Sequence, residues 1–347
     1  MSKLSALSSV ILASGMAAGA AGEDLSKIRI PEAHAVAVLE PAGPDRLYVL
    51  DMVFSHPIAG KAFAVDGVVQ KVLGTITTGY MPSLVITPEH KELLVLGSFW
   101  SRGARGARTD VVAIYDARTL APTAEVVLPP GRFLIADKGH NADLTTDGRY
   151  LLVTNMTPAT SVTIVDVPAR RVVGAVETPG CMLVYPSGPA RFSSLCADGA
   201  LFTASFDETG KATAARSKPF FDVQQDPLFE HAALDRRANV AHFVSYEGQV
   251  HSVDLSDSTP RFNPPWPLAS EAEHRRGWKP GGWKLLALHR DSGRLYVLMH
   301  RGGAWSHKNP GAEVWGIDLK TRQRVQRIKL KTGSRSEERR VGKECRS

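Results

Sequence analysis

Six strand-like segments that each end in an aspartate recur along this chain, and this repeat constrains the fold more than any other feature of the sequence. The aspartates are Asp66, Asp116, Asp166, Asp207, Asp254 and Asp318. Neighbouring members of the series lie 41 to 64 residues apart. A unit of about 40 to 50 residues with about four short strands is typical of one β-propeller blade. The sequence therefore predicts an all-β propeller with six visible blades.

Turn and loop residues support this prediction. Asp147-Gly148 precedes the strand expected at 149–154, as expected for a hairpin or strand-entry turn. The longest interval contains an insertion, 260–282, in which 269–276 is predicted to form a short helix capped by Ser270. A propeller protects its edge strands by closing a ring. We therefore expect a seven-bladed type of propeller, truncated to about six blades.

The N-terminal residues predict export. A lone Lys3 precedes an apolar run of small residues that ends in Ala18-Gly19-Ala20, which is the pattern of a signal peptide over 1–20. The alternative is a short amphipathic helix. The run is too short to cross a bilayer, and no later segment has about 20 uninterrupted apolar residues, so no membrane insertion is expected. We predict a periplasmic protein.

The C-terminal segment 331–347 differs from the rest. It has no strand periodicity and carries six basic and three acidic residues. A natural basic extension is one interpretation, and unrelated sequence joined to a truncated reading frame is the one we favour. The propeller domain is accordingly predicted to span 21–330. Without both ends, the formal net charge of +7 falls to about +3, a value that does not suggest a nucleic-acid partner.

Two of the three cysteines, Cys181 and Cys196, belong to the predicted domain, whereas Cys345 lies in the tail. In an oxidising compartment this pair favours a disulfide. Two reduced, buried thiols are the alternative. A metal site is disfavoured because two sulfurs have no flanking histidine, and the eleven histidines show no metal-binding spacing. We predict no metal and no catalytic residue in this chain.

Several segments resemble one family of periplasmic enzymes. The segments 101–110 (SRGARGARTD) and 120–125 (LAPTAE) resemble the large subunit of methylamine dehydrogenase. The segments 155–166 (NMTPATSVTIVD), 241–246 (AHFVSY) and 280–282 (PGG) are more similar to that of aromatic amine dehydrogenase. The resemblance extends from about 46 to 328. It points to the large (heavy) subunit of the tryptophan tryptophylquinone-dependent amine dehydrogenases.

This resemblance implies a non-catalytic propeller subunit without a cofactor of its own. Its expected partner is a small subunit that carries tryptophan tryptophylquinone, in an α2β2 assembly that oxidatively deaminates primary amines. Electrons are then expected to pass to a blue copper protein of the azurin or amicyanin type. The isolated chain should be inactive. The alternative is a stand-alone exported propeller that binds a ligand or a protein partner.

The resemblance also implies roles for particular residues. Arg102, Arg105 and Arg108 are expected to organise a loop and the contact with the small subunit, although plain solvated arginines would give the same pattern. Phe54 falls where the family's large subunit offers a phenylalanine to the substrate channel, and an apolar ring there would select substrates by shape. A core phenylalanine at a strand end is the alternative.

Overall fold

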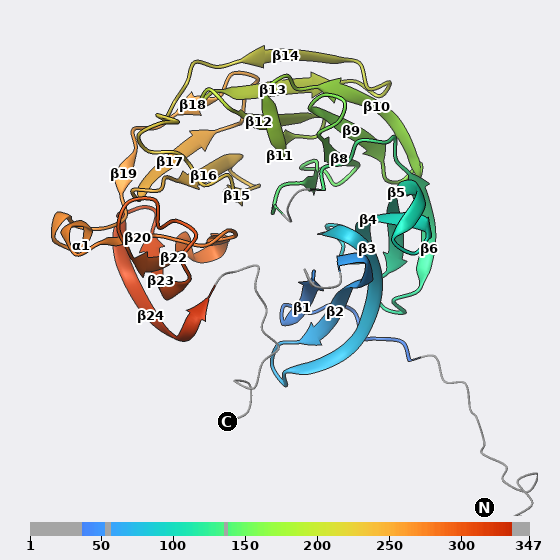
Figure 1. The fold of residues 1–347 in the computed structure, drawn as a ribbon, viewed down its shortest axis with the longest axis horizontal. Helices are drawn as coiled ribbons and strands as arrows, with labels where there is room; N and C mark the ends of the chain where they lie inside the picture. Colours follow the sequence, from blue (N-terminus) through green and yellow to red (C-terminus); the bar gives the residue numbers. More distant parts are fainter. Residues whose placement is uncertain (1–36, 53–56, 135–137, 335–347) are drawn as a thin grey trace, which may run out of the picture. The chain divides into compact units, whose positions relative to one another are not determined.

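The computed structural model describes residues 37–52, 57–134 and 138–334, whose regular structure is almost entirely β. The strands form five antiparallel sheets, which are arranged around a common centre (Figure 1). Strands that are consecutive in the sequence pair with each other in most of each sheet. The predicted all-β propeller class is therefore confirmed.

The strand bounds define the sheets. The first contains β1 (Arg46–Asp51), β2 (Gly60–Asp66), β3 (Lys71–Ile86), β4 (Glu92–Arg102), β5 (Arg105–Asp116) and β6 (Pro122–Val127). The second contains β7 (Ala142–Leu144), β8 (Tyr150–Asn155), β9 (Ser161–Asp166) and β10 (Arg171–Glu177), and the third β11 (Cys181–Gly188), β12 (Arg191–Cys196), β13 (Leu201–Phe206) and β14 (Ala212–Arg216). The fourth contains β15 (Ala233–Asp235), β16 (Val240–Val244), β17 (Gln249–Asp254), β18 (Arg261–Phe262) and β19 (Trp266–Pro267). The fifth contains β20 (Trp278–Pro280), β21 (Leu286–His289), β22 (Arg294–Arg301), β23 (Gly311–Asp318) and β24 (Gln323–Ser334).

The predicted number of blades was wrong, because the described strands form a five-bladed propeller rather than one of six or seven blades. The difference arises in the first sheet, where the units that end at Asp66 and Asp116 share one strand. The first part of β3 pairs with β2 as far as Gly79, and its second part pairs with β4 from Tyr80 onward. Gly79 has a φ of 74°, so the chain bends there without leaving the sheet.

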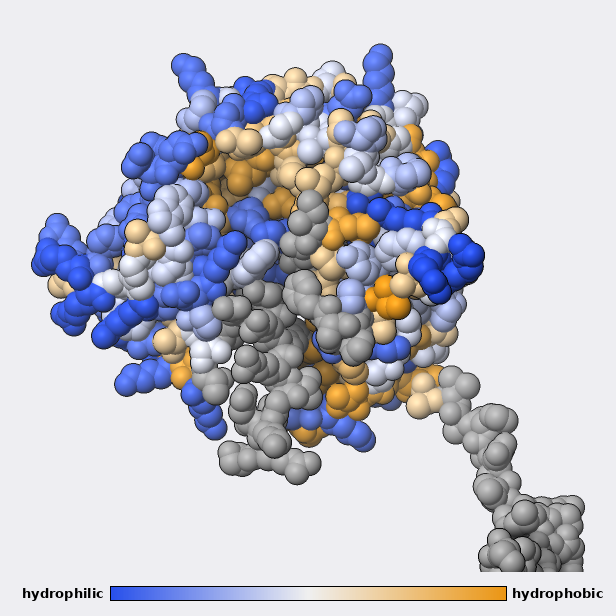
Figure 2. Space-filling model, in the orientation of Figure 1, coloured by the Kyte–Doolittle hydropathy of each residue, from blue (hydrophilic) through white to orange (hydrophobic). Residues whose placement is uncertain are grey.

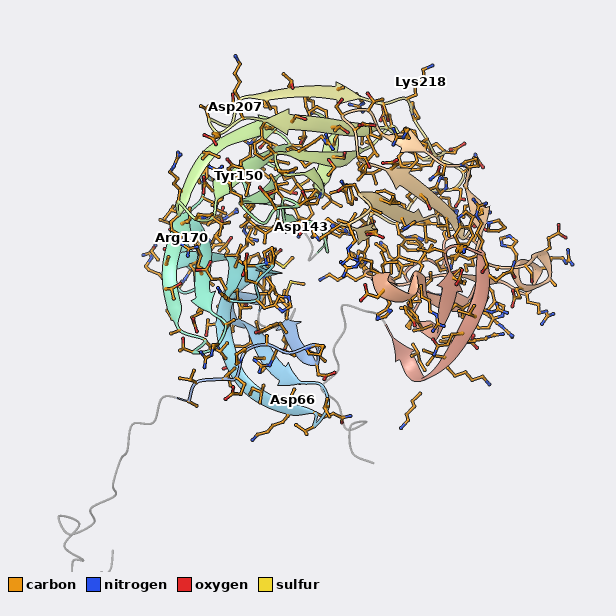
Figure 3. The ribbon with its side chains drawn as sticks, turned by 180° about the vertical axis from the view of Figure 1, so that it is seen from behind. Asp66, Asp143, Tyr150, Arg170, Asp207 and Lys218 are labelled. Carbon is orange, nitrogen blue, oxygen red and sulfur yellow. A yellow bond between two sulfur atoms is a disulfide. The ribbon has the colours of Figure 1, made fainter. Side chains whose placement is uncertain are left out.

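The repeated aspartates terminate strands by binding the backbone of the following turn. The Asp66 carboxylate accepts hydrogen bonds from the backbone N–H groups of Val68 and Val69. The other five aspartates accept equivalent bonds from residues two or three positions later. Such turns stabilise the charged carboxylate, and hydrogen bonds from Ser256 lower the pKa of Asp254 to about 2. Asp66 and Asp207 lie toward the outside of the ring (Figure 3).

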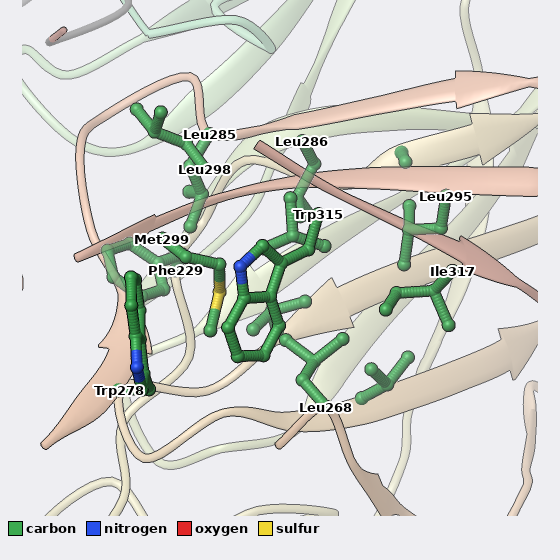
Figure 4. Packing of buried hydrophobic residues seen from close by; sticks show 14 of the residues in the cluster. Phe229, Leu268, Trp278, Leu285, Leu286, Leu295, Leu298, Met299, Trp315 and Ile317 are labelled. Carbon is green, nitrogen blue, oxygen red and sulfur yellow. The ribbon is translucent and has the colours of Figure 1, made fainter. Parts of the chain in front are cut away.

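Apolar side chains fill the space between neighbouring sheets. Because successive side chains of a strand point to opposite faces, Leu151 of β8 packs in the cluster shared with the first sheet, and Leu152 packs in the cluster shared with the third. Trp278 and Trp315 belong to the cluster between the fourth and fifth sheets (Figure 4). A strand that is covered on both faces needs an uninterrupted apolar run, which explains the composition of these segments.

The insertion in the last interval contains the predicted helix. This helix, α1 (Glu271–Arg275), begins after Ser270, whose side chain caps it as the sequence predicted. Glu273 completes a capping box with Ser270. It has no buried residue, and the surface around it is hydrophilic (Figure 2). Short 3₁₀ turns occur at Pro57–Ala59 and Arg290–Ser292. No helix in the described ranges has the length and apolar character needed to cross a bilayer.

Cys181 and Cys196 form the predicted disulfide, which joins the paired strands β11 and β12. Both residues are buried beside Ala200. We expect the double substitution Cys181→Ala and Cys196→Ala to lower the free energy of unfolding by about 3 kcal/mol, because the bond closes a loop of about 15 residues in the unfolded chain. Urea denaturation of the variant and of the oxidised wild type measures this loss. A difference below about 1 kcal/mol would contradict it.

Candidate functional site

The arginines that were predicted to lie at an interface are in the hairpin between β4 and β5. Arg102 and Arg105 pair across its tip, and both are exposed. Arg108 lies further from the tip and binds the Asp110 carboxylate through Nε and Nη2, at 2.9 and 2.7 Å. Two of the three guanidinium groups are thus exposed at the hairpin tip, while the third is held by an ion pair of the chain itself.

Behind this hairpin lies a buried polar network centred on Arg132. Its Nη1 donates to the carbonyl oxygen of Met81 at 2.8 Å, and its Nη2 donates to the carbonyl oxygen of Tyr80 at 2.9 Å and to Ser98 Oγ at 2.8 Å. The Ser98 hydroxyl in turn donates to Asp110. Burial lowers the pKa of Arg132 to about 10, against the opposing effect of Asp110. Arg132 therefore remains charged at neutral pH and ties the first sheet to the following linker.

The linkers between sheets lie against hairpins at one end of the sheets, which we call the loop face. It consists of the hairpins 102–105, 155–161, 245–249 and 301–311, the described linker residues 128–134, 138–141, 217–232 and 263–277, and the loop 281–285. The backbone hydrogen bonds that join linkers to hairpins are Phe133 N to Thr154 O, Phe229 N to Val244 O and Gly302 N to Gly277 O. The arginine hairpin belongs to the same end, because Arg108 Nη2 donates to the Arg132 carbonyl oxygen at 3.3 Å.

Side chains from two linkers and from a loop of the fifth sheet meet on the loop face. We call Lys138, His140, Glu230, His231 and Trp283 the central cluster. The ammonium group of Lys138 donates to the Glu230 carboxylate and lies 4.0 Å from the centroid of the Trp283 ring. His140 Nε2 lies 2.9 Å from the carbonyl oxygen of Ala232. These contacts join the linkers that precede the second and fourth sheets to a loop within the fifth sheet.

The two histidines of the central cluster are neutral at pH 7. Their ring centroids are 5.6 Å apart. Burial lowers the pKa of both, and burial together with the nearby His140 lowers that of His231 to about 3. Tyr185 OH donates to the Glu230 carbonyl oxygen at 2.6 Å, and burial raises its pKa well above the ordinary value. These groups position the linkers rather than exchange protons at neutral pH.

A cavity of about 240 Å³ adjoins the central cluster. Aromatic rings, Lys138 and Lys308 line it, together with the Glu230 carboxylate that binds Lys138. Tyr246 and His307 stack with ring centroids 4.0 Å apart. The loop face therefore offers aromatic rings and positive charge for binding.

Two other predictions concern Phe54 and metal binding. Phe54 lies outside the described residues, and its role at a substrate channel stays a prediction. In the part of the chain that the structure describes, no three histidine, cysteine, aspartate or glutamate side chains converge in a way that could hold a metal ion.

Sequence reasoning did not find the central cluster. Lys138 and Glu230 are 92 positions apart, and neither lies in a recognisable motif. Tryptophans are a partial indication, since residues of this type contribute to both cores and interfaces. Trp278 and Trp315 are core residues, whereas Trp305 is 64% exposed on the loop that also carries His307.

Fold and site together define a β-propeller of the kind that presents a binding surface at the loop end of its sheets. The methylamine dehydrogenase heavy chain family matches residues 44–338, and the chain belongs to this family. It is 28% identical over 303 residues to the methylamine dehydrogenase heavy chain of Methylophilus methylotrophus, with 87% of this chain and 74% of that one covered. It is 30% identical over 302 residues to the heavy chain of Paracoccus versutus, with 86% and 70% covered. The chain is thus a heavy subunit of the amine dehydrogenase type, and the closer similarity to aromatic amine dehydrogenase stays a prediction.

Proposed function

We propose that this chain is the non-catalytic heavy subunit of a periplasmic amine dehydrogenase that oxidatively deaminates primary amines. Its membership of the methylamine dehydrogenase heavy chain family over residues 44–338 is the observation that carries the proposal. The small light subunit carries tryptophan tryptophylquinone and supplies the amine oxidation. In an α2β2 assembly, electrons leave that subunit for a blue copper protein. The signal peptide at 1–20 directs export to the periplasm.

The loop face supports a binding role for this chain. Exposed arginines project from the hairpin between β4 and β5, and the central cluster uses its charged groups in internal contacts. The buried histidines are neutral at pH 7 because of their lowered pKa values. A surface of this composition favours docking of a protein partner. Arg102 and Arg105 then contact the small subunit, Arg108 braces their hairpin, and Phe54 borders the substrate channel.

Co-expression with a methylamine dehydrogenase light chain tests the proposal. We expect a purified complex that reduces a redox dye when methylamine or an aromatic primary amine is added, with the quinone absorbance in the light chain. The heavy chain alone should show neither activity nor quinone absorbance, because the quinone is expected in the light chain and the heavy chain is expected to supply only the surface that binds it. Comparing the two amines also tests the predicted aromatic preference. Amine oxidation by the isolated heavy chain, or failure of the two chains to associate, would overturn the proposal.

A further inference from the structure

The loop between β22 and β23 presents an exposed tryptophan on the loop face. Trp305 is 64% exposed, whereas tryptophans usually bury most of their surface. Its backbone φ is 59°, in the left-handed region that disfavours residues with a Cβ. A large apolar ring that is exposed on a strained backbone is costly to a free subunit, and such positions cluster at functional sites.

Hydrogen bonds connect the ends of this loop and tie it to Gly282. Ser306 Oγ donates to the Gly303 carbonyl oxygen at 2.8 Å and lies 2.9 Å from His300 Nε2. The backbone N–H of Gly282 donates to the carbonyl oxygen of His307 at 2.9 Å. The Trp305 ring is therefore presented by a braced loop, which reduces the entropy lost on binding.

Trp305 belongs to an aromatic group that spans two sheets. Tyr246, in the hairpin of the fourth sheet, stacks on His307 and meets Trp305 edge-on, with ring centroids 6.2 Å apart. Phe229 lies beneath, 4.7 Å from Tyr246. We call Tyr246, Trp305 and His307 the aromatic platform. Tryptophan and tyrosine are among the residues that contribute most to protein interfaces.

The charge beside the aromatic platform is positive. Lys138 is neutralised by Glu230. Lys308 contacts the Trp283 ring, with 5.7 Å between its Nζ and the ring centroid, and it forms no ion pair with another described residue. The exposed Arg102 and Arg105 belong to the same loop face. A two-fold contact between copies of this chain would oppose like charges, so an acidic partner is the better match.

We propose that the aromatic platform is the main anchor for the light chain, which inserts an apolar side chain beside a carboxylate. The apolar side chain contacts the Trp305 and Tyr246 rings, and the carboxylate binds Lys308. This inference rests on the proposed function, because it takes the light chain as the occupant. Most of the binding free energy between the two chains then comes from a few residues that flank the 240 Å³ cavity. The tip of the arginine hairpin contributes less.

Light-chain binding by purified heavy-chain variants tests this anchor. We expect Trp305→Ala to raise the dissociation constant at least 30-fold, as for an interface hot spot. Lys308→Glu should weaken binding at least tenfold at low salt, and by less at 0.5 M salt because ions screen the lost attraction. Phe262→Ala is the matched control, since Phe262 is a 36% exposed aromatic residue of the outermost strand β18. It should bind within threefold of the wild type.

The outcomes separate this inference from the proposed function. If wild-type heavy chain binds the light chain and Trp305→Ala binds equally well, the anchor is wrong while the heavy-subunit function stands. If the wild type does not bind, the function itself fails. Sedimentation of the heavy chain alone tests the remaining occupant: a dimer that Trp305→Ala disrupts would assign the platform to a second copy of this chain and overturn the proposal.

Discussion

Replacing Arg132 with methionine is expected to lower the free energy of unfolding by about 3 to 5 kcal/mol, as the loss of one partner from a buried charge network does. The variant loses three hydrogen bonds to Met81, Tyr80 and Ser98. It also leaves the carbonyl oxygens of Met81 and Tyr80 in β3 without their hydrogen-bond donor, and an unpaired buried acceptor lowers stability further. Urea denaturation followed by circular dichroism measures the change.

The substitution Arg261→Met provides the matched control. Arg261 pairs with Asp254 and Asp257, but 62% of its side chain is exposed, and exposed ion pairs contribute about 0 to 1 kcal/mol. Its variant should unfold close to the wild-type midpoint. A loss below about 1 kcal/mol for Arg132→Met would mean that the network adds little stability and that the first sheet is held by apolar packing.

Features set by neighbouring residues could be predicted from the sequence. The aspartates that close strands were recognised from their recurrence along the chain, and in the structure their carboxylates bind the backbone of the next few residues. The cap of α1 was predicted because Ser270 stands at the start of the expected helix and serine is a preferred N-cap residue. Periodicity then led to the propeller class, because each strand requires side chains that suit its two covered faces.

The blade count could not be predicted, because it depends on where strands pair. The segment that forms β3 contains Gly74, Gly79 and Pro82, residues that often interrupt strands. In the structure the chain stays in the sheet through Gly79 and Met81, both with positive φ. Whether such a point becomes a turn or a bend is decided by the partners β2 and β4, which lie on either side in the sequence.

The site escaped prediction for a related reason. Arg102, Arg105 and Arg108 look alike in sequence, yet only Arg108 lies within reach of Asp110. Lys138 meets Glu230 and Trp283 because two linkers and a loop of the fifth sheet converge on the loop face. Such contacts join residues that are separated in the sequence by whole sheets. No short sequence pattern can therefore predict them.

Stability should fall as the pH decreases from about 6.5 to 4, because buried histidines resist protonation in the folded chain. Burial lowers the pKa of His242 to about 4 and that of His231 to about 3. In the unfolded chain each histidine titrates near 6.5. Below that pH the unfolded state binds protons that the folded state does not, so stability is complete above 6.5 and is lost until the folded pKa is reached.

At pH 5 the expected loss is about 2 kcal/mol for each of these two histidines, relative to pH 7.5. Urea denaturation at both pH values measures it, and His242→Gln should recover about 2 kcal/mol of the difference. The strand-closing aspartates depend on pH in the same direction but at lower pH, since hydrogen bonds lower the pKa of Asp66 and Asp254 and their contribution is lost only as the pH falls through about 4 and below. The window from 6.5 to 4 therefore isolates the histidines. Equal stability at pH 5 and 7.5, or a pH dependence that His242→Gln leaves unchanged, would show that the native state binds these protons as readily as the unfolded chain does.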